Sequence, residues 1–448
     1  LEYAKDAQAL ENELPASFMR AMPAKEPRVV LLTGATGFLG AYILADLLDK
    51  RRNHVEKVYV HVRANDADSA QQRLRDALAG RGLWCEAWEQ EGRVQAVVGD
   101  LSKPHLGLND ADWAHLVEEV HVIVHNGALV HWVYPYSKLR AANVLSTVEV
   151  MRLANEGQPK SVAFVSSTSA LDTEHYIRFS DTSAQGVLES DSLDGSASDL
   201  KSGYGQSKWV AERLLMAAAS RGLATAIIRP GYVVGDSKTA VTNTDDFLFR
   251  LIKGSAQLGL IPDMNNTINM VPVDHVARVT SLAGLAATQW PENRQTHAAV
   301  FHVTSHPTIR YNEFLGALIE YGWNVRPAEY LEWRTALENH VLASAAAGNT
   351  GLDADSNALF PLLHFVLDDL PTSTKSPELN DANTTKLLTE AHELDVVRGV
   401  DVPLVGLYLS WLVAVGFLPP PASKSARALP TLPEGVARQA MGRGSAAV

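Results

Sequence analysis

The glycine-rich stretch TGATGFLG, residues 33–40, constrains the fold of this chain most strongly. It follows the apolar run RVVLLT and opens the helical pattern FLGAYILADLLDK, so a buried strand, a tight turn and a helix succeed one another. Glycines in such a turn let backbone N–H groups approach a pyrophosphate, whose charge the helix N-terminus favours. The alternative is an ordinary strand-to-helix turn. We predict a dinucleotide site with contacts from Gly34, Thr36, Gly37, Phe38, Leu39 and Gly40.

Further Val- and Ile-rich runs predict a parallel sheet covered on both faces, because helical segments separate them. The predicted strands are KVYVHVR, VQAVVGD, VHVIVHNGA, SVAFVSSTS and TAIIRPGYV. The fold class is therefore α/β, a Rossmann-type doubly wound parallel sheet with a smaller, mainly helical C-terminal substrate lobe. The expected division is a linker over 1–27, a nucleotide-binding domain over 28–242 and 268–306, a substrate lobe over 243–267 and 307–421, and a disordered tail over 422–448.

The charge balance argues against nucleic acid or an acidic membrane as a partner, since the net charge is −12 and either would require a basic face. The single cysteine, Cys85, excludes an internal disulfide and fits a reducing compartment. The first residues carry mixed charge without an apolar core, and the uncharged run 402–418 contains Pro403 and is short for a bilayer span. We expect a cytoplasmic protein with no membrane segment.

The tip of the second predicted strand predicts NADPH as the cofactor. A site for NAD usually carries an acid there to hold the ribose 2′-hydroxyl, but YVHVRAND offers His61 and Arg63 before its first acid, Asp66. Arg73 is a second candidate for the 2′-phosphate, with a solvated helix arginine as the alternative. The remaining predicted cofactor contacts lie at other strand ends: Asp100, Leu101, Asn126, Gly127, Ala128, Pro230, Gly231 and Val233.

Two tyrosine–lysine pairs share a spacing of four residues, Tyr204 with Lys208 and Tyr134 with Lys138. A lysine one helical turn after a tyrosine places a cation on the same helix face and favours the phenolate. Only Tyr204 follows the hydroxyl-bearing strand end VSSTS, and the other pair contains Pro135. We predict Tyr204 and Lys208 as catalytic and cofactor-binding, and Tyr134 and Lys138 as channel lining or structural.

A carbonyl that accepts hydride develops negative charge on oxygen, so it requires hydrogen-bond donors at that oxygen. The strand end supplies Ser167 as the first candidate and Thr168 as the second. His125 and His131 lack carboxylate or cysteine partners at ligand spacing, and we predict no metal site.

The motifs TGATGFLG, VGD, HNGA, VSSTS, YGQSK and RPGYVVG together resemble the extended short-chain dehydrogenase/reductase family over about residues 28–305. Longer blocks are similar to the terminal thioester reductase domains of fungal L-2-aminoadipate reductases over nearly the whole chain. These blocks are HNGALVHWVYPYSKLR, SSTSALDTEHY, GYGQSKW, NTDDFLFRLIKGS, NMVPVDHVAR, FPLLHFVLDDLPTSTKSPEL and GFLPPP. One departure is Phe360, where the family pattern has tyrosine.

The resemblance implies a multidomain enzyme in which an adenylation domain and an acyl carrier precede this domain. NADPH would reduce the thioester on the phosphopantetheine arm, most simply L-2-aminoadipyl to its semialdehyde in lysine biosynthesis. Tyr204 would protonate the oxyanion, Ser167 or Thr168 would assist, and Lys208 would bind the nicotinamide ribose. Asn243, Asp245 and Asp246 are possible lining of the arm's channel, with a helix N-cap as the alternative.

Three alternatives stay open at the level of sequence. The first is a fungal carboxylic acid reductase or peptide-synthetase-like reductase with another acyl group. The second is an NAD-dependent nucleotide-sugar epimerase or dehydratase, against which Arg63 argues. The third is a non-catalytic nucleotide sensor, against which Tyr204 and Lys208 argue.

Overall fold

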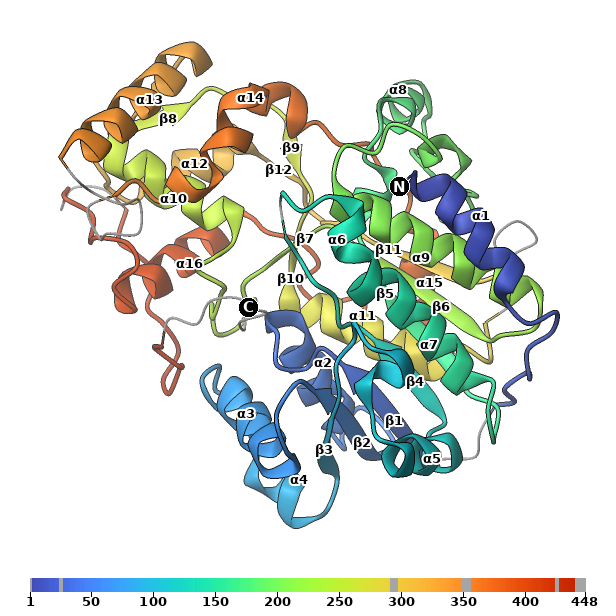
Figure 1. The fold of residues 1–448 in the computed structure, drawn as a ribbon. Helices are drawn as coiled ribbons and strands as arrows, with labels where there is room; N and C mark the ends of the chain where they lie inside the picture. The colour runs from blue at the N-terminus through green and yellow to red at the C-terminus, as the bar shows by residue number, and fades with distance from the viewer. Residues whose placement is uncertain are drawn as a thin grey trace.

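The computed structural model describes residues 2–23, 27–131, 133–290, 297–347, 356–423 and 427–439. A parallel sheet of seven strands lies at its centre (Figure 1), in the order β11-β6-β5-β4-β1-β2-β3. The strands are β1 (Arg28–Thr33), β2 (Val55–Val62), β3 (Val94–Val98), β4 (Val122–His125), β5 (Ser161–Val165), β6 (Thr225–Pro230) and β11 (Ala299–Val303). The predicted α/β class is confirmed.

Strand order reverses between β1 and β4, and ligands of open α/β sheets bind outside the carboxyl ends of the strands at such a point. The register pairs Thr33, the last residue of β1, with His125, the last residue of β4. The glycine-rich turn and the HNGA segment therefore leave the sheet side by side.

Helices cover both faces of the sheet because alternate strand residues point to opposite sides. Val30 and Leu32 of β1 pack in one apolar cluster and Leu31 in the other. One face is covered by α2 (Phe38–Leu48), α3 (Ala67–Ala79), α11 (Val273–Ala286) and α15 (Ala382–Glu390). The opposite face is covered by α1 (Tyr3–Glu13), α5 (Asp110–Glu119), α7 (Ser146–Ala154) and α9 (Gly203–Ser220).

A second, mainly helical lobe with its own apolar cluster lies beside the sheet (Figure 1). Its helices are α10 (Phe247–Leu258), α12 (Tyr311–Glu320), α13 (Tyr330–Ala346), α14 (Leu363–Ser373) and α16 (Val402–Ala414). Pairs of short strands accompany them: β7 (Tyr232–Val234) with β10 (Met270–Pro272), β8 (Leu260–Pro262) with β13 (Arg326–Ala328), and β9 (Thr267–Ile268) with β12 (Ile309–Arg310).

Short helical segments complete the connections. They are α4 (Glu86–Gln90), η1 (Pro104–Gly107), α6 (Tyr136–Arg140), η2 (Ala141–Leu145), η3 (Thr168–Leu171), α8 (Glu174–Thr182), η4 (Asp194–Ser196) and η5 (Phe360–Leu362). No helix among the described ranges has both the length and the apolar character needed to span a bilayer.

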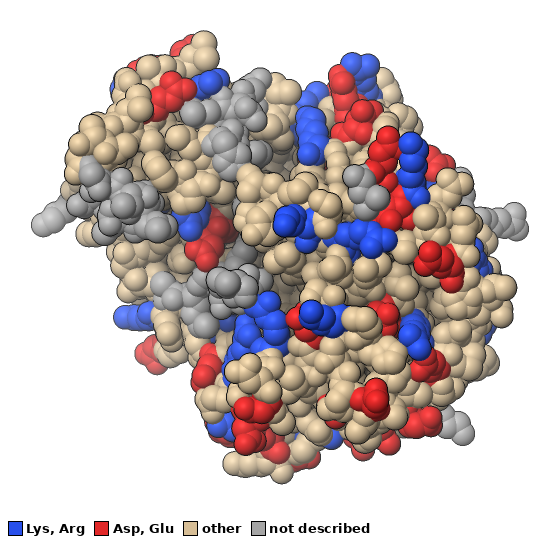
Figure 2. Space-filling view, viewed as in Figure 1, with Lys and Arg blue, Asp and Glu red and all other residues tan. Residues whose placement is uncertain are grey.

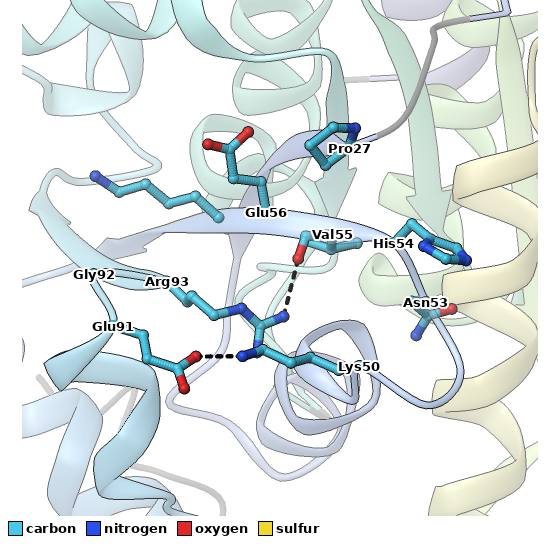
Figure 3. A pocket seen from close by; sticks show the side chains of 10 residues that line it. Pro27, Lys50, Asn53, His54, Val55, Glu56, Glu91, Gly92 and Arg93 are labelled. Carbon is cyan, nitrogen blue, oxygen red and sulfur yellow. Dashed lines mark hydrogen bonds and ion pairs between the residues drawn. The ribbon is translucent and has the colours of Figure 1, made fainter.

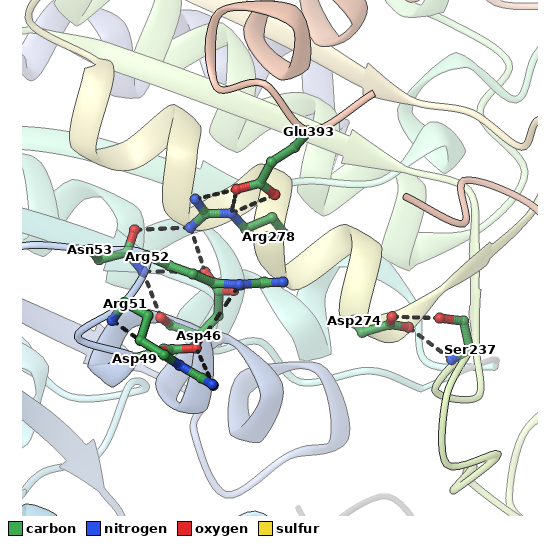
Figure 4. Close-up of polar contacts among 9 residues, drawn as sticks. All are labelled: Asp46, Asp49, Arg51, Arg52, Asn53, Ser237, Asp274, Arg278 and Glu393. Atoms are coloured by element: carbon green, nitrogen blue, oxygen red, sulfur yellow. Dashed lines mark hydrogen bonds and ion pairs between the residues drawn. The ribbon is translucent and has the colours of Figure 1, made fainter. Parts of the chain in front are cut away.

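Arg278 of α11 joins three parts of the nucleotide-binding layer (Figure 4). Its guanidinium donates to Glu393 at 2.7–3.0 Å, to Asp46 of α2 at 3.1 Å and to Asn53 at 2.9 Å. At the start of the same helix, Asp274 accepts hydrogen bonds from the backbone and hydroxyl of Ser237. Removing one member of such a buried ion pair costs about 3–5 kcal/mol of folding free energy.

Three segments lie differently from the predicted domain division. The helix α1, inside the predicted linker 1–27, is docked on α9 with Tyr3, Leu10 and Leu14 buried. The helix α15, inside the predicted substrate lobe, packs Leu387 and Leu388 against the sheet's helices because both residues are apolar and face α11. Residues 427–439, inside the predicted disordered tail, contact α16, where Trp411 Nε1 donates to the carbonyl of Ala437 at 2.8 Å. Residues 440–448 lie outside the described residues.

Candidate active site

The glycine turn forms a cradle that side chains would fill. Gly34 has φ +77°, and a Cβ there would lie 2.7 Å from Gly127 Cα. A Cβ on Gly40 would lie 2.0 Å from the carbonyl oxygen of Gly34. Helix α2 then begins at Phe38 with Gly37 as N-cap, and its first N–H groups have no acceptor within the helix. This close backbone geometry fits a pyrophosphate, as the sequence predicts.

A chain of hydrogen bonds fixes the neighbouring end of β4. The backbone N–H of Gly127 donates to Thr33 Oγ1 at 2.8 Å, so the Thr33 hydroxyl is free to donate to His125 Nδ1, also at 2.8 Å. His125 Nε2 lies 3.1 Å from Ser146 Oγ, which donates to the carbonyl of Ala142. Burial, helped by the charge of Lys208, lowers the pKa of His125 to about 3. The imidazole is thus a neutral structural link between the two strand ends.

The residues predicted for the adenosine end lie at the carboxyl ends of β2 and β3. Arg63 follows β2 and is exposed, and Arg73 of α3 donates to the Arg63 carbonyl at 2.7 Å. Burial raises the pKa of Asp100, but hydrogen bonds from Ser102 and the charge of Arg63 outweigh it, so that pKa lies below its usual value. The structure therefore brings Arg63, Arg73 and Asp100 together. Two arginines at one strand end form a cationic environment.

The other predicted cofactor residues occupy the same edge. Asn126 Nδ2 donates to the carbonyl of Gly34 at 3.3 Å, and Leu101 Cδ1 would lie 2.7 Å from a Cβ on Gly127. Pro230 ends β6, Gly231 lies against Asn269, and Val233 pairs with Val271. The half-buried positions beside these contacts are Thr36, Leu39 and Ala128.

Tyr204 and Lys208 lie on the first two turns of α9, whose N-cap Ser202 accepts a hydrogen bond from the Gly205 N–H at 3.0 Å. Lys208 is 2 % exposed, and its Nζ donates to the carbonyl of Val165 at 2.7 Å. The same Nζ lies 5.7 Å from the centroid of the Tyr204 ring and 4.7 Å from that of Phe164. Burial lowers the pKa of Lys208 to about 7, although the charge of Glu212 opposes that shift.

The two candidate hydroxyls lie directly after β5. Ser167 is the N-cap of η3, with Oγ accepting from the Ser169 N–H at 3.1 Å, and Thr168 is the first residue of that turn. Both residues are half-buried. The turn packs on α9, because a Cβ on Gly205 would lie 2.7 Å from the Ser169 carbonyl oxygen. The structure thus places Ser167, Thr168, Tyr204 and Lys208 at one strand end, as expected.

The second pair lies outside this arrangement. Tyr134 precedes α6, whose N-cap is Pro135, so Tyr134 and Lys138 do not share one continuous helix. The Tyr134 ring is 41 % exposed and stacks on His131 with centroids 3.6 Å apart. Lys138 is exposed, and basic side chains lie near the middle of the face drawn in Figure 2, over the region of α6.

Asn143 was not predicted from the sequence. Its amide accepts from the Leu129 N–H at 2.7 Å and donates to the Leu129 carbonyl and to Ser207 Oγ, both at 3.0 Å. It thereby ties the loop after β4 to α9, between Tyr204 and Lys208. Asn143 lies in η2, a π-helical turn, and such turns frequently mark functional sites. A π-turn has no simple sequence pattern, so only the backbone geometry reveals it.

The acidic segment before α10 acts as a helix cap. Asp246 is the N-cap and accepts from the Leu248 N–H at 2.8 Å, while Asp245 pairs with Arg250 at 3.0 Å. Asn243 accepts from the Asp245 N–H at 3.0 Å. These contacts satisfy the alternative interpretation of NTDDF, a capped helix start.

A depression of about 430 Å³ lies at the opposite, amino-terminal edge of the sheet (Figure 3). Lys50 pairs with Glu91 across it at 2.6 Å, and the Arg93 guanidinium donates to the carbonyls of Leu48 and Val55. It lies at the edge of the sheet opposite to the strand ends that neighbour Tyr204. Within the described ranges no three His, Cys, Asp or Glu side chains gather in a way that could hold a metal ion.

A comparison with protein families identifies the chain: the family described as Male sterility protein, an NAD-binding domain, matches residues 32–280. The chain belongs to this family. Among solved structures, the terminal R domain from the myxalamid PKS-NRPS biosynthetic pathway is 32 % identical, with a TM-score of 0.77, and the match covers 93 % of this chain and 99 % of that one. The predicted resemblance to terminal reductase domains is confirmed, and the Male sterility family assignment supports a nicotinamide cofactor.

Curated relatives of this Male sterility family member are much longer than the chain. An L-2-aminoadipate reductase large subunit of Penicillium chrysogenum is 48 % identical over 96 % of this chain and 30 % of its own length. An L-2-aminoadipate reductase of Schizosaccharomyces pombe is 46 % identical over 94 % of this chain and 29 % of its own length. The chain thus spans about 30 % of the length of these relatives.

Proposed function

We propose that this domain reduces a carrier-bound acyl thioester to an aldehyde with NADPH, and that the acyl group is L-2-aminoadipyl. The observation that carries the proposal is the buried Lys208 ammonium beside Tyr204, at the strand end that also presents Ser167 and Thr168. The likeness to L-2-aminoadipate reductases over more than nine-tenths of the chain supports the substrate.

The cradle around Gly34 fits a dinucleotide, and the bound nicotinamide would supply the hydride. In this proposal Tyr204 donates its phenolic proton to the oxygen of the reduced carbonyl, and the hydroxyl of Ser167 or Thr168 donates a hydrogen bond to the same oxygen. The Lys208 ammonium stabilises the phenolate left behind and holds the nicotinamide ribose. Collapse of the hemithioacetal then returns a proton to the departing sulfur and releases aldehyde and thiol.

The preference for NADPH follows from charge in this proposal. Arg63 and Arg73 lie together where the ribose 2′-substituent would be, and Asp100 lies at the next strand end. A guanidinium matches a phosphate better than a hydroxyl. The partner would be the phosphopantetheine arm of an acyl carrier domain that is preceded by an adenylation domain in the same polypeptide, because the relatives are about three times as long as this chain.

The direct test supplies L-2-aminoadipyl and aryl thioesters of phosphopantetheine, each with NADPH or NADH, and follows nucleotide oxidation and aldehyde formation. We expect the aminoadipyl thioester with NADPH to have the highest kcat/KM. Preference for an aryl thioester would support a carboxylic acid reductase instead. Absence of turnover with every thioester would reject the proposed reaction.

A substitution at Arg63 tests the proposed preference for NADPH over NADH. Arg63→Ala should weaken NADPH binding by about 10- to 100-fold, because hydrogen bonds to charged groups contribute ~1.5–3 kcal/mol and ~1.4 kcal/mol is tenfold. NADH binding should be almost unchanged. Nucleotide fluorescence titrations measure both, and Arg51→Ala, at an exposed surface ion pair, is the control. Equal losses for the two nucleotides would contradict the phosphate assignment.

A further inference from the structure

A fully buried ion pair lies directly behind the candidate catalytic residues. Glu212 and Arg229 are both 0 % exposed, with Arg229 Nη2 2.6 Å from Glu212 Oε2 and Arg229 Nε 2.9 Å from the same oxygen. Glu212 lies one helical turn after Lys208 on α9, and Arg229 immediately precedes Pro230 at the end of β6. The pair therefore connects the helix of Tyr204 to a strand of the cofactor edge.

The second carboxylate oxygen of Glu212 reaches a third element. Glu212 Oε1 accepts a hydrogen bond from the Ser166 hydroxyl and another from Arg229 Nε at 3.1 Å. Ser166 immediately precedes Ser167, and its N–H donates to the carbonyl of Ile228 on β6 at 2.7 Å. One carboxylate thus fixes the relative positions of the end of β5, α9 and β6. Tyr204 and Lys208 lie on α9, and Ser167 and Thr168 directly follow Ser166.

The chain of contacts continues across the sheet. A guanidinium has only donors, so His302 Nε2, which lies 3.0 Å from Arg229 Nη1, accepts. His302 Nδ1 then carries the proton and donates to the carbonyl of Asn380 at 2.6 Å. Burial, followed by the charge of Arg229, lowers the pKa of His302 to about 3, which agrees with a neutral ring. Tyr176 of α8 also faces Arg229.

The negative charge of Glu212 also favours the protonated form of Lys208. Among the described residues, the groups that face the Lys208 ammonium are the neutral His125 of β4, the Val165 carbonyl and Phe164 ring of β5, the Tyr204 ring and Glu212. Glu212 supplies the only negative charge among them. A buried lysine without a nearby anion tends to lose its proton.

We propose that Glu212 is a positioning residue for the candidate catalytic pair, which keeps the Lys208 ammonium charged and holds β5 at a fixed distance from α9. This inference rests on the proposed function only for its kinetic readout. Glu212 does not touch the substrate, because both of its oxygens are occupied by Ser166 and Arg229.

The test compares Glu212→Gln with Glu393→Gln, which makes the same carboxylate-to-amide change at the buried Arg278. Both variants should lower Tm. Only Glu212→Gln should move the alkaline limb of kcat to lower pH, by about one pH unit, which is the lower end of the shift caused by a nearby opposite charge. The proposal would be overturned if the alkaline limb of the kcat–pH profile stayed in place in folded Glu212→Gln, or if it moved equally in Glu393→Gln.

Two further measurements separate the positioning effect of Glu212 from its charge effect, and this inference from the proposed thioester reaction. Ser166→Ala retains every charge and removes only a hydroxyl, so it should fold and keep the alkaline limb in place. It should lower kcat about tenfold at unchanged NADPH affinity, because Ser167 and Thr168 are then positioned less closely against α9. A kcat of Ser166→Ala equal to that of the wild type would reject the proposal that Glu212 holds β5 at a fixed distance from α9. An NMR titration of ¹⁵N-labelled lysines reports the Lys208 pKa without any acyl substrate, so failure of the thioester reaction is distinguishable from failure of this inference.

Discussion

The two tyrosine–lysine pairs have the same spacing in sequence and opposite environments in the fold. Lys208 is buried, donates to a strand carbonyl and lies over the Tyr204 ring, whereas Lys138 is exposed and Tyr134 lies before the helix that carries it. Spacing alone therefore does not make an acid–base pair. Burial of the ammonium beside a hydroxyl-bearing strand end distinguishes the first pair, because a charge acts strongly only where water is excluded.

The strongest test of this comparison is the matched substitution of both tyrosines. Tyr204→Phe removes the proposed proton donor and should lower kcat/KM by about 10²–10⁴-fold, the usual contribution of a general acid. Tyr134→Phe, at a partly exposed ring, should change activity by less than about twofold. Steady-state kinetics with an acyl-pantetheine thioester measures both, and NADPH fluorescence confirms that the nucleotide still binds. Equal losses in the two variants would remove the distinction.

The two lysines should differ in their dependence on pH. Burial lowers the pKa of Lys208 to about 7, so its ammonium is lost as pH rises through that value, and kcat/KM should fall about tenfold per pH unit above it. Lys208→Arg keeps a charge at all working pH values and should remove this alkaline limb, although the longer side chain lowers the maximum. Lys138→Arg should leave the profile unchanged. A limb that persists in Lys208→Arg would assign it to another group.

The smallest effect is expected for a substitution at Gly203, where the start of α9 contacts the segment that carries Tyr134. A Cβ on Gly203 would lie 2.3 Å from the Tyr134 carbonyl oxygen and 2.6 Å from the Tyr136 nitrogen. Gly203→Ala should therefore push α6 away from α9 and cost about 1–3 kcal/mol of folding free energy, as overpacking does. Gly316→Ala on α12, where a Cβ meets nothing within 4 Å, should instead stabilise by about 0.5–1 kcal/mol. Denaturant unfolding compares them, and a Gly203→Ala variant of wild-type stability would contradict the close contact.

The contacts of α1 show a further difference between the two tyrosine–lysine pairs. Asp6 of α1 accepts from Tyr136 at 2.5 Å and from Arg140 at 2.7 and 2.9 Å. Helix α6, which carries Lys138, is thus held by α1. Helix α9, which carries Lys208, is held by the contacts of Glu212 with Ser166 and Arg229. One region is fixed by a partly exposed ion pair at the surface and the other by a fully buried one.

The fold and much of the candidate site could be predicted because they depend on local patterns. The strand, glycine turn and helix around Gly34 and the order of YGQSK after VSSTS are readable along the chain, and parallel strands bring their carboxyl ends to one edge. Asn143 and Glu212 could not be predicted, since their partners Leu129 and Ser166 are distant in sequence and no spacing links them.

The sequence by itself determined the parallel sheet and the glycine turn, and it predicted Tyr204 in place of Tyr134, because these follow from periodicity, from glycine and from chain order. Only the tertiary structure decided that Lys208 is buried against Val165, that α1 and α15 pack on the sheet's helices, and that an ion pair fixes β5, α9 and β6. The physical reason is that desolvation and ion pairing depend on which distant residues meet. A linear pattern does not contain that information.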